Sequence, residues 1–115
     1  MEKILDGLNQ AVGIKGSMVI TKDGILVSAR VGEGLNQDAV AALTASFIIN
    51  AARCLERVGK EEFNQLILRS AKGKLVLEDA GKAFLVVIAD ERLQLNVTIL
   101  DIKSAAMRLK KELGL

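Results

Sequence analysis

The sequence predicts a single α+β domain, residues 1–115, in which helices cover a five-stranded, mostly antiparallel sheet. Three observations lead to this fold class. Apolar residues follow helical and strand spacings in the order helix, two strands, helix, three strands, helix. Short turns that contain glycine join neighbouring strands, which makes their pairing antiparallel. The segment 83–89 is apolar on both faces, so we expect it at the centre of a sheet with helices on both sides.

The N-terminal third of the chain predicts a helix and a hairpin. Residues 2–12 place apolar side chains at helical spacing, and Gly13 is a suitable residue to end that helix. A short apolar strand, 17–21, and a return strand, 25–31, come next. The Asp-Gly pair between the two strands is a strong signal for a tight hairpin.

The middle of the chain predicts one long helix. Asn36 can accept a hydrogen bond from a free amide of the first turn as an N-cap, and the carboxylate of Asp38 suits the positive end of the helix dipole. The apolar spacing continues to Val58, and Gly59 then ends the helix. At 1.5 Å per residue such a helix is about 33 Å long. That length is large for a domain of this size.

The C-terminal half predicts three strands, 63–70, 74–78 and 83–89, followed by a helix over about 95–113. One face of this last helix is apolar and is expected to join the core. Four basic residues are expected on its outside: Lys103, Arg108, Lys110 and Lys111. Their positive charges lie near the C-terminal end of the helix, where they interact favourably with the helix dipole.

The long middle helix carries two apolar stripes rather than one. At 100° per residue, the stripe assigned to the sheet of the same chain contains Val40, Leu43, Phe47, Ala51, Cys54, Leu55 and Val58. A second stripe lies nearly opposite, with Ile48 on its flank, and contains Ala42, Ala45, Ile49 and Ala52. A polar seam between the stripes contains Ser46, Asn50, Arg53 and Arg57. An exposed apolar stripe marks a contact site, and a symmetric homodimer is favoured over cover by another helix of the chain.

The composition excludes most catalytic chemistry. The chain has no histidine, so no imidazole is present to act as a base. The one cysteine, Cys54, can form neither an internal disulfide nor a zinc site, so we expect a buried apolar role and a cytoplasmic protein. A phosphate-binding loop is absent because Gly81-Lys82 is followed by Ala83 rather than by serine or threonine.

Charge and apolar runs exclude further classes of partner. Sixteen basic and 14 acidic residues give a net charge of +2, and three phenylalanines are the only aromatic residues, so no nucleic-acid partner is expected. No uninterrupted apolar run reaches the ~18 residues of a membrane span. The adjacent acids Glu61 and Glu62 are expected to form a solvated rim rather than a catalytic pair. We therefore expect no enzymatic activity, no cofactor and no metal.

Several strings of the sequence resemble the roadblock family, which includes the dynein light chains of roadblock type and many bacterial and archaeal members. The similar segments are Gly13-Ile14-Lys15-Gly16, Asp23-Gly24-Ile25-Leu26-Val27-Ser28, the alanine-rich helix 38–58, Gly73-Lys74-Leu75-Val76-Leu77 and the strand 84–89. They extend over nearly the whole chain. Where many members begin the last helix with Asn-Leu-Gly, this chain has Gln94-Leu95-Asn96.

The resemblance implies a roadblock/profilin-like arrangement, with the long middle helix on one face of the sheet and two outer helices on the other. It also implies a homodimer in which third strands pair edge to edge and middle helices pack together. Together with the second apolar stripe, it gives a predicted dimer interface of Ala42, Ala45, Ile48, Ile49, Ala52, Leu66, Ile67 and Leu68.

The resemblance implies two classes of function. The first is a dimeric regulator of a small Ras-like GTPase, for which the polar seam residues Ser46, Asn50, Arg53 and Arg57 are the candidate contacts. The second is a structural adaptor subunit of a motor or signalling complex, without effect on nucleotide turnover. A small-molecule sensor of similar topology would need polar side chains directed into a cavity, and the strand 83–89 offers none.

The isolated protein is expected neither to bind nor to hydrolyse GTP, because it has no phosphate-binding loop and no histidine base. Titration of the purified protein with a fluorescent GTP analogue checks this prediction. Saturable micromolar binding would contradict it.

Overall fold

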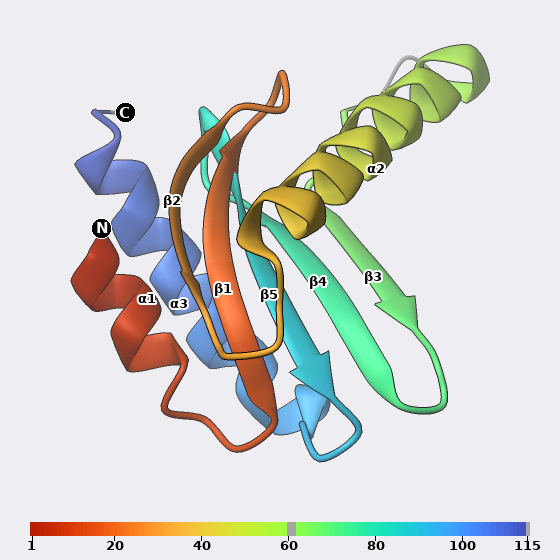
Figure 1. Ribbon diagram of the computed structural model, residues 1–115. Coiled ribbons are helices and arrows are strands. Elements are labelled where there is room, and N and C mark those ends of the chain that lie inside the picture. Colours follow the sequence, from red (N-terminus) through yellow and green to blue (C-terminus); the bar gives the residue numbers. More distant parts are fainter. Residues whose placement is uncertain (60–61, 115) are drawn as a thin grey trace.

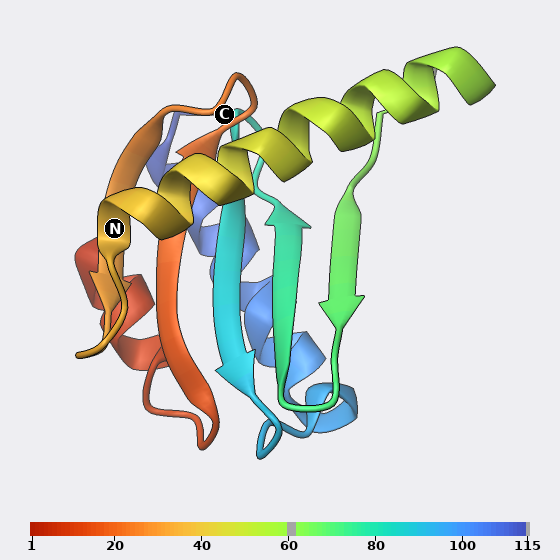
Figure 2. The same cartoon turned by 45° about the vertical axis from the view of Figure 1, so that its right-hand side comes forward.

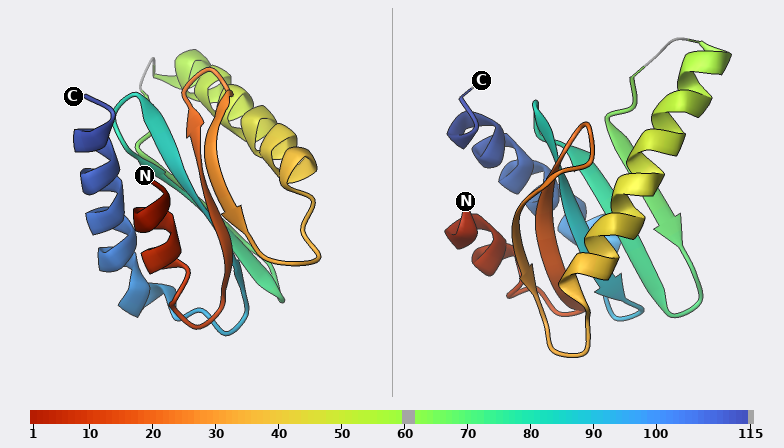
Figure 3. Two further views of the ribbon diagram at one scale, coloured as in Figure 1. Left: turned by 60° about the vertical axis from the view of Figure 1, so that its left-hand side comes forward. Right: turned by 45° about the horizontal axis from the view of Figure 1, so that its top comes forward.

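A five-stranded antiparallel sheet between two layers of helices forms the fold in the computed structural model, which describes residues 1–59 and 62–114 (Figure 1). The elements in chain order are α1 (Glu2–Leu8), β1 (Ile14–Thr21), β2 (Leu26–Val31), α2 (Gln37–Val58), β3 (Gln65–Arg69), β4 (Gly73–Asp79), β5 (Ala83–Asp90) and α3 (Leu95–Glu112). Helices α1 and α3 cover one face of the sheet, and α2 crosses the other (Figure 3). The predicted fold class is thereby confirmed.

The strand order is β2-β1-β5-β4-β3, and every neighbouring pair is antiparallel. Strand β5, which the sequence predicts to be buried on both faces, lies at the centre. Strands β2 and β3 are the two edges. An edge strand leaves a row of backbone amide and carbonyl groups open to pairing.

The core is divided by the sheet into two apolar clusters. The larger one fills the space beneath α1 and α3 and includes Leu5, Val19, Leu85, Ile102 and Leu109. The smaller one lies beneath α2 and includes Met18, Ile20, Ile48, Phe84 and Val86. Alternation along each strand produces the two clusters, because successive side chains point to opposite faces.

Three cross-strand rows make up the face of the sheet beneath α2. The first row, near the β1–β2 turn, is Leu26, Ile20, Phe84 and Asp79. The second is Ala29, Met18, Val86, Leu77 and Leu66. The third, nearest the β3–β4 turn, is Val31, Gly16, Ile88, Leu75 and Leu68. Its three members on β5, β4 and β3 are less buried than those of the second row, and Leu68 is exposed.

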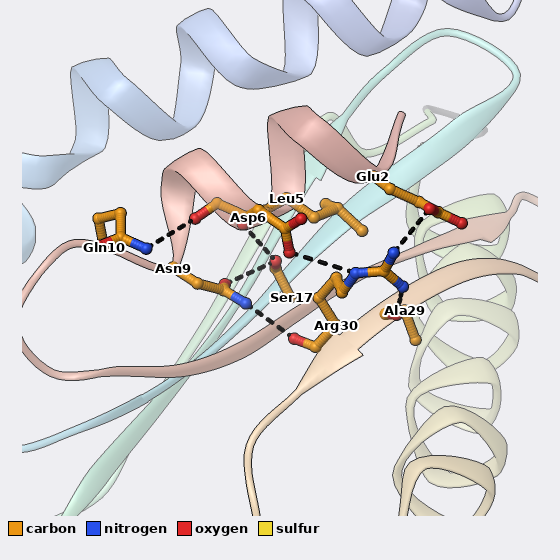
Figure 4. Close-up of polar contacts among 8 residues, drawn as sticks. All are labelled: Glu2, Leu5, Asp6, Asn9, Gln10, Ser17, Ala29 and Arg30. Carbon is orange, nitrogen blue, oxygen red and sulfur yellow. Dashed lines mark hydrogen bonds and ion pairs between the residues drawn. The ribbon is translucent and has the colours of Figure 1, made fainter.

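Helix α1 is fastened to β1 and β2 by a group of polar contacts (Figure 4). The buried Ser17 hydroxyl donates to Asn9 Oδ1 at 2.8 Å, and Asn9 Nδ2 donates to the Arg30 carbonyl oxygen at 2.9 Å. The Arg30 guanidinium pairs with Glu2 at 2.6 Å and Asp6 at 3.2 Å on the outer side of α1. Residues of the edge strand β2 thus contact α1 on that side of the sheet.

The structure ends α1 at Leu8, earlier than the predicted limit of residue 12. Asn9 is the C-cap, and its side chain is held by Ser17 and Arg30. Gly13 has a different role from the predicted one: its φ is 96°, and a Cβ there would lie 2.5 Å from the backbone nitrogen of Leu93. The glycine therefore permits a close approach of two chain segments.

The turn before α3 contains a compact ion pair. Arg92 Nη2 donates to Asp90 Oδ2 at 2.8 Å, and the Arg92 backbone amide donates to Asp90 Oδ1 at 2.9 Å. These hydrogen bonds hold the pKa of Asp90 below its usual value, and Asp90 raises the pKa of Arg92. The pair orders the turn and lies outside the surfaces described below.

The observed caps of α2 agree with those predicted from the sequence, but the rotation of the helix about its axis, which decides the face toward the sheet, differs from the prediction. Asn36 Oδ1 accepts from the Ala39 amide at 3.0 Å, and Gly59 is the C-cap. The residues of α2 that are buried against the sheet are Ala41, Thr44 and Ile48. Four members of the stripe predicted to face the sheet are instead exposed: Leu43, Phe47, Cys54 and Val58.

A physical reason explains the error. Small side chains at Ala41 and Thr44 let the helix axis approach the sheet. Ile48 is the one large, fully buried residue of α2, and it packs between the helix and the sheet. Helical periodicity alone places the largest residues inward and cannot detect this close approach. The placement of Ile48 in the predicted dimer interface is therefore wrong, because Ile48 is 1% exposed within its own protomer.

The neighbouring isoleucines of α2 allow a matched test. Ile48 is 1% exposed and Ile49 is 38% exposed. Ile48→Ala should lower the free energy of unfolding by ~2–5 kcal/mol because it leaves a cavity in the core. Ile49→Ala should cost less than ~1 kcal/mol. Urea unfolding of both variants at one fixed protein concentration measures the difference, and equal losses would contradict the assigned rotation of α2.

Candidate functional site

The polar seam of α2 points away from the sheet. Ser46, Asn50, Arg53 and Arg57 are all exposed, on the side of the helix opposite Ala41, Thr44 and Ile48. The Ser46 hydroxyl donates to the Ala42 carbonyl oxygen at 3.4 Å, so it lies along the helix. Arg57 is in the last helical turn, where a positive charge also interacts favourably with the helix dipole. Within residues 1–59 and 62–114, neither arginine forms an ion pair.

One flank of α2 lies beside the β1–β2 turn of the same chain. A Cβ placed on Gly24 would lie 3.1 Å from the Ala45 Cβ and 3.7 Å from the Ile49 Cδ1. Ala52, further along this flank, lines a cleft together with Lys22. Much of the second apolar stripe predicted from the sequence therefore faces the protomer's own hairpin, although Ala42, Ile49 and Ala52 retain exposed surface.

The opposite flank of α2 is apolar and open. Leu43 is 65% exposed and Phe47 is 43% exposed. Because the first flank faces the β1–β2 turn, these residues lie on the side of α2 nearer the other end of the strands, where the third cross-strand row includes the exposed Leu68. The open apolar face is defined here as Leu43, Phe47, Leu68, Leu75 and Ile88. Sequence reasoning missed the first two as surface residues because their size and spacing are equally typical of a core.

The open apolar face is continuous with the free edge of β3. Leu66 and Leu68 lie on the α2 side of this strand, and Ile67 packs toward the other cluster. Strand β3 pairs with β4 on one side only, which confirms the predicted edge position of this strand. A strand edge and an adjoining apolar surface together satisfy what a second protein chain needs: backbone pairing and burial.

A cleft of about 650 Å³ lies under the C-terminal half of α2. Its lining residues are Lys22, Ile48, Ala52, Glu56, Arg57, Glu62, Phe63, Gly81 and Phe84. The Phe63 and Phe84 rings stack with centroids 4.7 Å apart, and Lys22 Nζ lies 4.3 Å above the Phe84 ring while it pairs with Asp79. Glu62 is exposed, and its predicted rim neighbour Glu61 lies outside the described residues.

The polar seam and the open apolar face are the surfaces that the described residues offer for contact with another chain. Within residues 1–59 and 62–114, no cluster of three side chains suited to metal binding is found. Cys54 is exposed on α2, contrary to the predicted burial. One helix in this part of the chain, α2, is long and apolar enough to span a bilayer by length and composition alone. Length and composition alone are weak evidence for a membrane span, because a helix packed on a sheet can meet the same criteria.

Comparison with known proteins identifies related chains. Residues 1–89 match the model of the Roadblock/LC7 domain family. The Methanocaldococcus jannaschii protein MJ1340 is 30% identical over 110 residues, which are 96% of this chain and 96% of that protein. Myxococcus xanthus MglB is 28% identical with a TM-score of 0.86, over 96% of this chain and 92% of that one.

A more distant structure shares the fold alone. LokiProfilin2, solved in complex with rabbit actin, is 16% identical with a TM-score of 0.63, over 96% of this chain and 95% of that one. The order of strands and the division of helices between the two faces are thus those of a roadblock/profilin-like fold.

Proposed function

The chain belongs to the Roadblock/LC7 domain family, and on that premise we propose that it is a non-catalytic homodimer that binds a small Ras-like GTPase and modulates its GTP hydrolysis. Family membership and the likeness to MglB support a regulatory or adaptor role. The observation that carries the finer proposal is the position of the polar seam of α2, outward and beside an open apolar face. The cytoplasm is the compartment we propose for it.

The dimer is proposed to form through the edges of two β3 strands. A two-fold axis perpendicular to the sheet pairs identical strands antiparallel and keeps the same face of both sheets on one side. Both α2 helices then lie on one face of the joined sheet. Leu66, Ile67 and Leu68 lie at the centre of this edge, and among them Ile67 directs its backbone amide and carbonyl groups away from β4.

The same symmetry covers the open apolar face. The C-terminal end of α2 extends past β3 beyond its own sheet (Figure 2). In an antiparallel β3 pair, the partner's third cross-strand row lies on the side toward which this end extends. The overhanging turn, which carries Cys54 and the exposed Val58, would then pack over the partner's incompletely covered row. We therefore assign the contact to the flank of Leu43 and Phe47 rather than to the alanine-rich flank beside the hairpin.

The platform for a GTPase consists of the two polar seams, which the dimer places side by side. Arg53 and Arg57 can form forked hydrogen bonds to acidic and carbonyl groups of the GTPase switch loops. Ser46 and Asn50 add shorter polar groups between them. Because the sequence contains no phosphate-binding loop, regulation would act through the shape and order of the partner's switch loops.

A charge on the open apolar face should separate the protomers. Leu43→Glu combined with Phe47→Glu places carboxylates where the proposed interface is apolar, and burial of unpaired charge is unfavourable. We expect the native protein to have the mass of a dimer by light scattering at micromolar concentration and the variant to have the mass of a monomer. Ile25→Glu, at another exposed apolar site, is the matched control and should remain dimeric. A monomeric native protein would refute the proposed dimer.

Loss of the two arginines should weaken the binding of a GTPase without affecting the fold. Arg53→Ala combined with Arg57→Ala should lower affinity for a small Ras-like GTPase of the same organism by at least ~30-fold, since interfacial arginines that become desolvated cost ~2 kcal/mol or more when truncated. The dimer mass and the melting temperature should stay nearly unchanged.

Lys110→Ala combined with Lys111→Ala removes equal charge from the opposite side of the sheet and serves as the control. Calorimetric titration measures the affinities. Unchanged affinity in the arginine variant would mean that the GTPase binds a surface other than the polar seam. Binding without any change in the rate of GTP hydrolysis would favour the structural adaptor instead.

A further inference from the structure

The outer surface of α3 carries a second exposed apolar stripe, on the side of the sheet opposite α2. Val97 is 64% exposed, Leu100 is 71% exposed and Met107 is 64% exposed. The inner side of the helix is buried in the core of the same chain, where its residues are Leu95, Ile102, Ala105, Ala106 and Leu109. Large apolar side chains on both sides of a helix exceed what the fold requires.

The exposed residues have the spacing of a helix–helix seam. Val97, Leu100, Ser104, Met107 and Lys111 follow one another at intervals of three, four, three and four residues. This alternation is the one that keeps side chains on a line facing a second helix. Beside the line, a hollow of about 480 Å³ separates α3 from α1 and is lined by residues that include Gly7, Ser104 and Arg108. A Cβ on Gly7 would meet no other atom within 4 Å, so this side of the hollow is open.

One border of the seam is basic and the other is mixed in charge. Lys103 and Lys110 follow one border, and Asp101 and Arg108 follow the other. Lys111 ends the seam itself. Lys103 is half exposed and has Glu78 only at 4.0 Å, so it can reach a partner. The charge of the borders therefore selects for acidic residues on whatever covers the seam.

A second copy of α3 fits this surface poorly. Parallel self-pairing would bring Lys103 of one helix toward Arg108 of the other, which opposes like charges. Antiparallel self-pairing would bring Lys103 toward Lys110 and Asp101 toward Arg108, so repulsion on one border offsets attraction on the other. A different protein with acidic borders avoids this repulsion.

We propose that the seam Val97–Leu100–Met107 of α3 is a docking surface for an amphipathic helix of another protein, with an apolar stripe and acidic residues placed beside it to face the basic ones of α3. The helix would lie along α3, bury Leu100 and Met107, and direct its carboxylates at Lys103, Arg108 and Lys110. Because α3 and α2 lie on opposite faces of the sheet, this surface stays free when a GTPase occupies the α2 platform (Figure 3). The protein would then link its α2 partner to a second one.

The test uses two designed peptides of about three heptads each, with leucine along the seam. One has glutamate on both borders and the other has lysine. By fluorescence anisotropy with the full chain, the glutamate peptide should bind at least ~10-fold more tightly than the lysine peptide, because several of its carboxylates pair with Lys103, Arg108 and Lys110. Leu100→Ser combined with Met107→Ser should abolish saturation, whereas Ile25→Ser, an exposed apolar control on the hairpin, should not change it.

Reversal of the border charges gives a second readout that a loss of folding cannot mimic. Lys103→Glu combined with Lys110→Glu should invert the preference, so that the lysine peptide binds more tightly. Three results would overturn the proposal: no saturable binding of either peptide up to ~1 mM, equal binding of both peptides, or undiminished binding by the serine variant. Binding to phosphatidylglycerol vesicles without binding to the glutamate peptide would also overturn it, in favour of a membrane surface.

Discussion

The incomplete cover of one sheet face by α2 is the constraint on which the rest of the structure depends. A single helix that crosses five strands obliquely cannot shield three rows of side chains, and it buries only Ala41, Thr44 and Ile48 of its own residues. The first two rows are sealed at their centres, and the third retains exposed surface at the free edge of β3. Apolar surface that the protomer cannot bury is available to a second chain, and the dimer that we propose depends on the geometry of this one crossing.

Asymmetry between the two sheet edges adds to this constraint. Residues of strand β2 are engaged on the α1 side, because Asn9 bonds to the Arg30 carbonyl and the Arg30 guanidinium pairs with Glu2 and Asp6. Strand β3 has no corresponding contact among the described hydrogen bonds and ion pairs from α1. The edge pairing that we propose therefore uses β3 rather than β2. Assembly through one edge closes after two copies, whereas assembly through both edges would continue indefinitely.

The order of elements, the hairpins, the central position of β5 and both caps of α2 could be predicted from the sequence, because each depends on local spacing or on a single residue such as Asn36 or Gly59. The rotation of α2 could not, since Leu43 and Phe47 have the size and spacing of core residues. The early end of α1 depends on Ser17 and Arg30, which are distant in sequence from Asn9. The exposed stripe of α3 could not be predicted for a similar reason: Val97, Leu100 and Met107 alternate with apolar residues of the core stripe, such as Ile102 and Ala106, and the outside of the helix was assigned to its basic residues. Contacts between elements, rather than propensities within them, decide these features.

Hydrogen exchange at the β3 amides tests the central claim, a dimer joined through this edge, most directly. At high protein concentration the amides of Gln65, Ile67 and Arg69, which alternate with the β4-bonded ones and point away from β4, should be protected, and dilution should release them while the amides of β2 exchange unchanged. The outward amides of β3 would gain this protection only from a partner strand. Outward β3 amides that exchange rapidly at every concentration, in a protein that is nevertheless dimeric, would contradict the account.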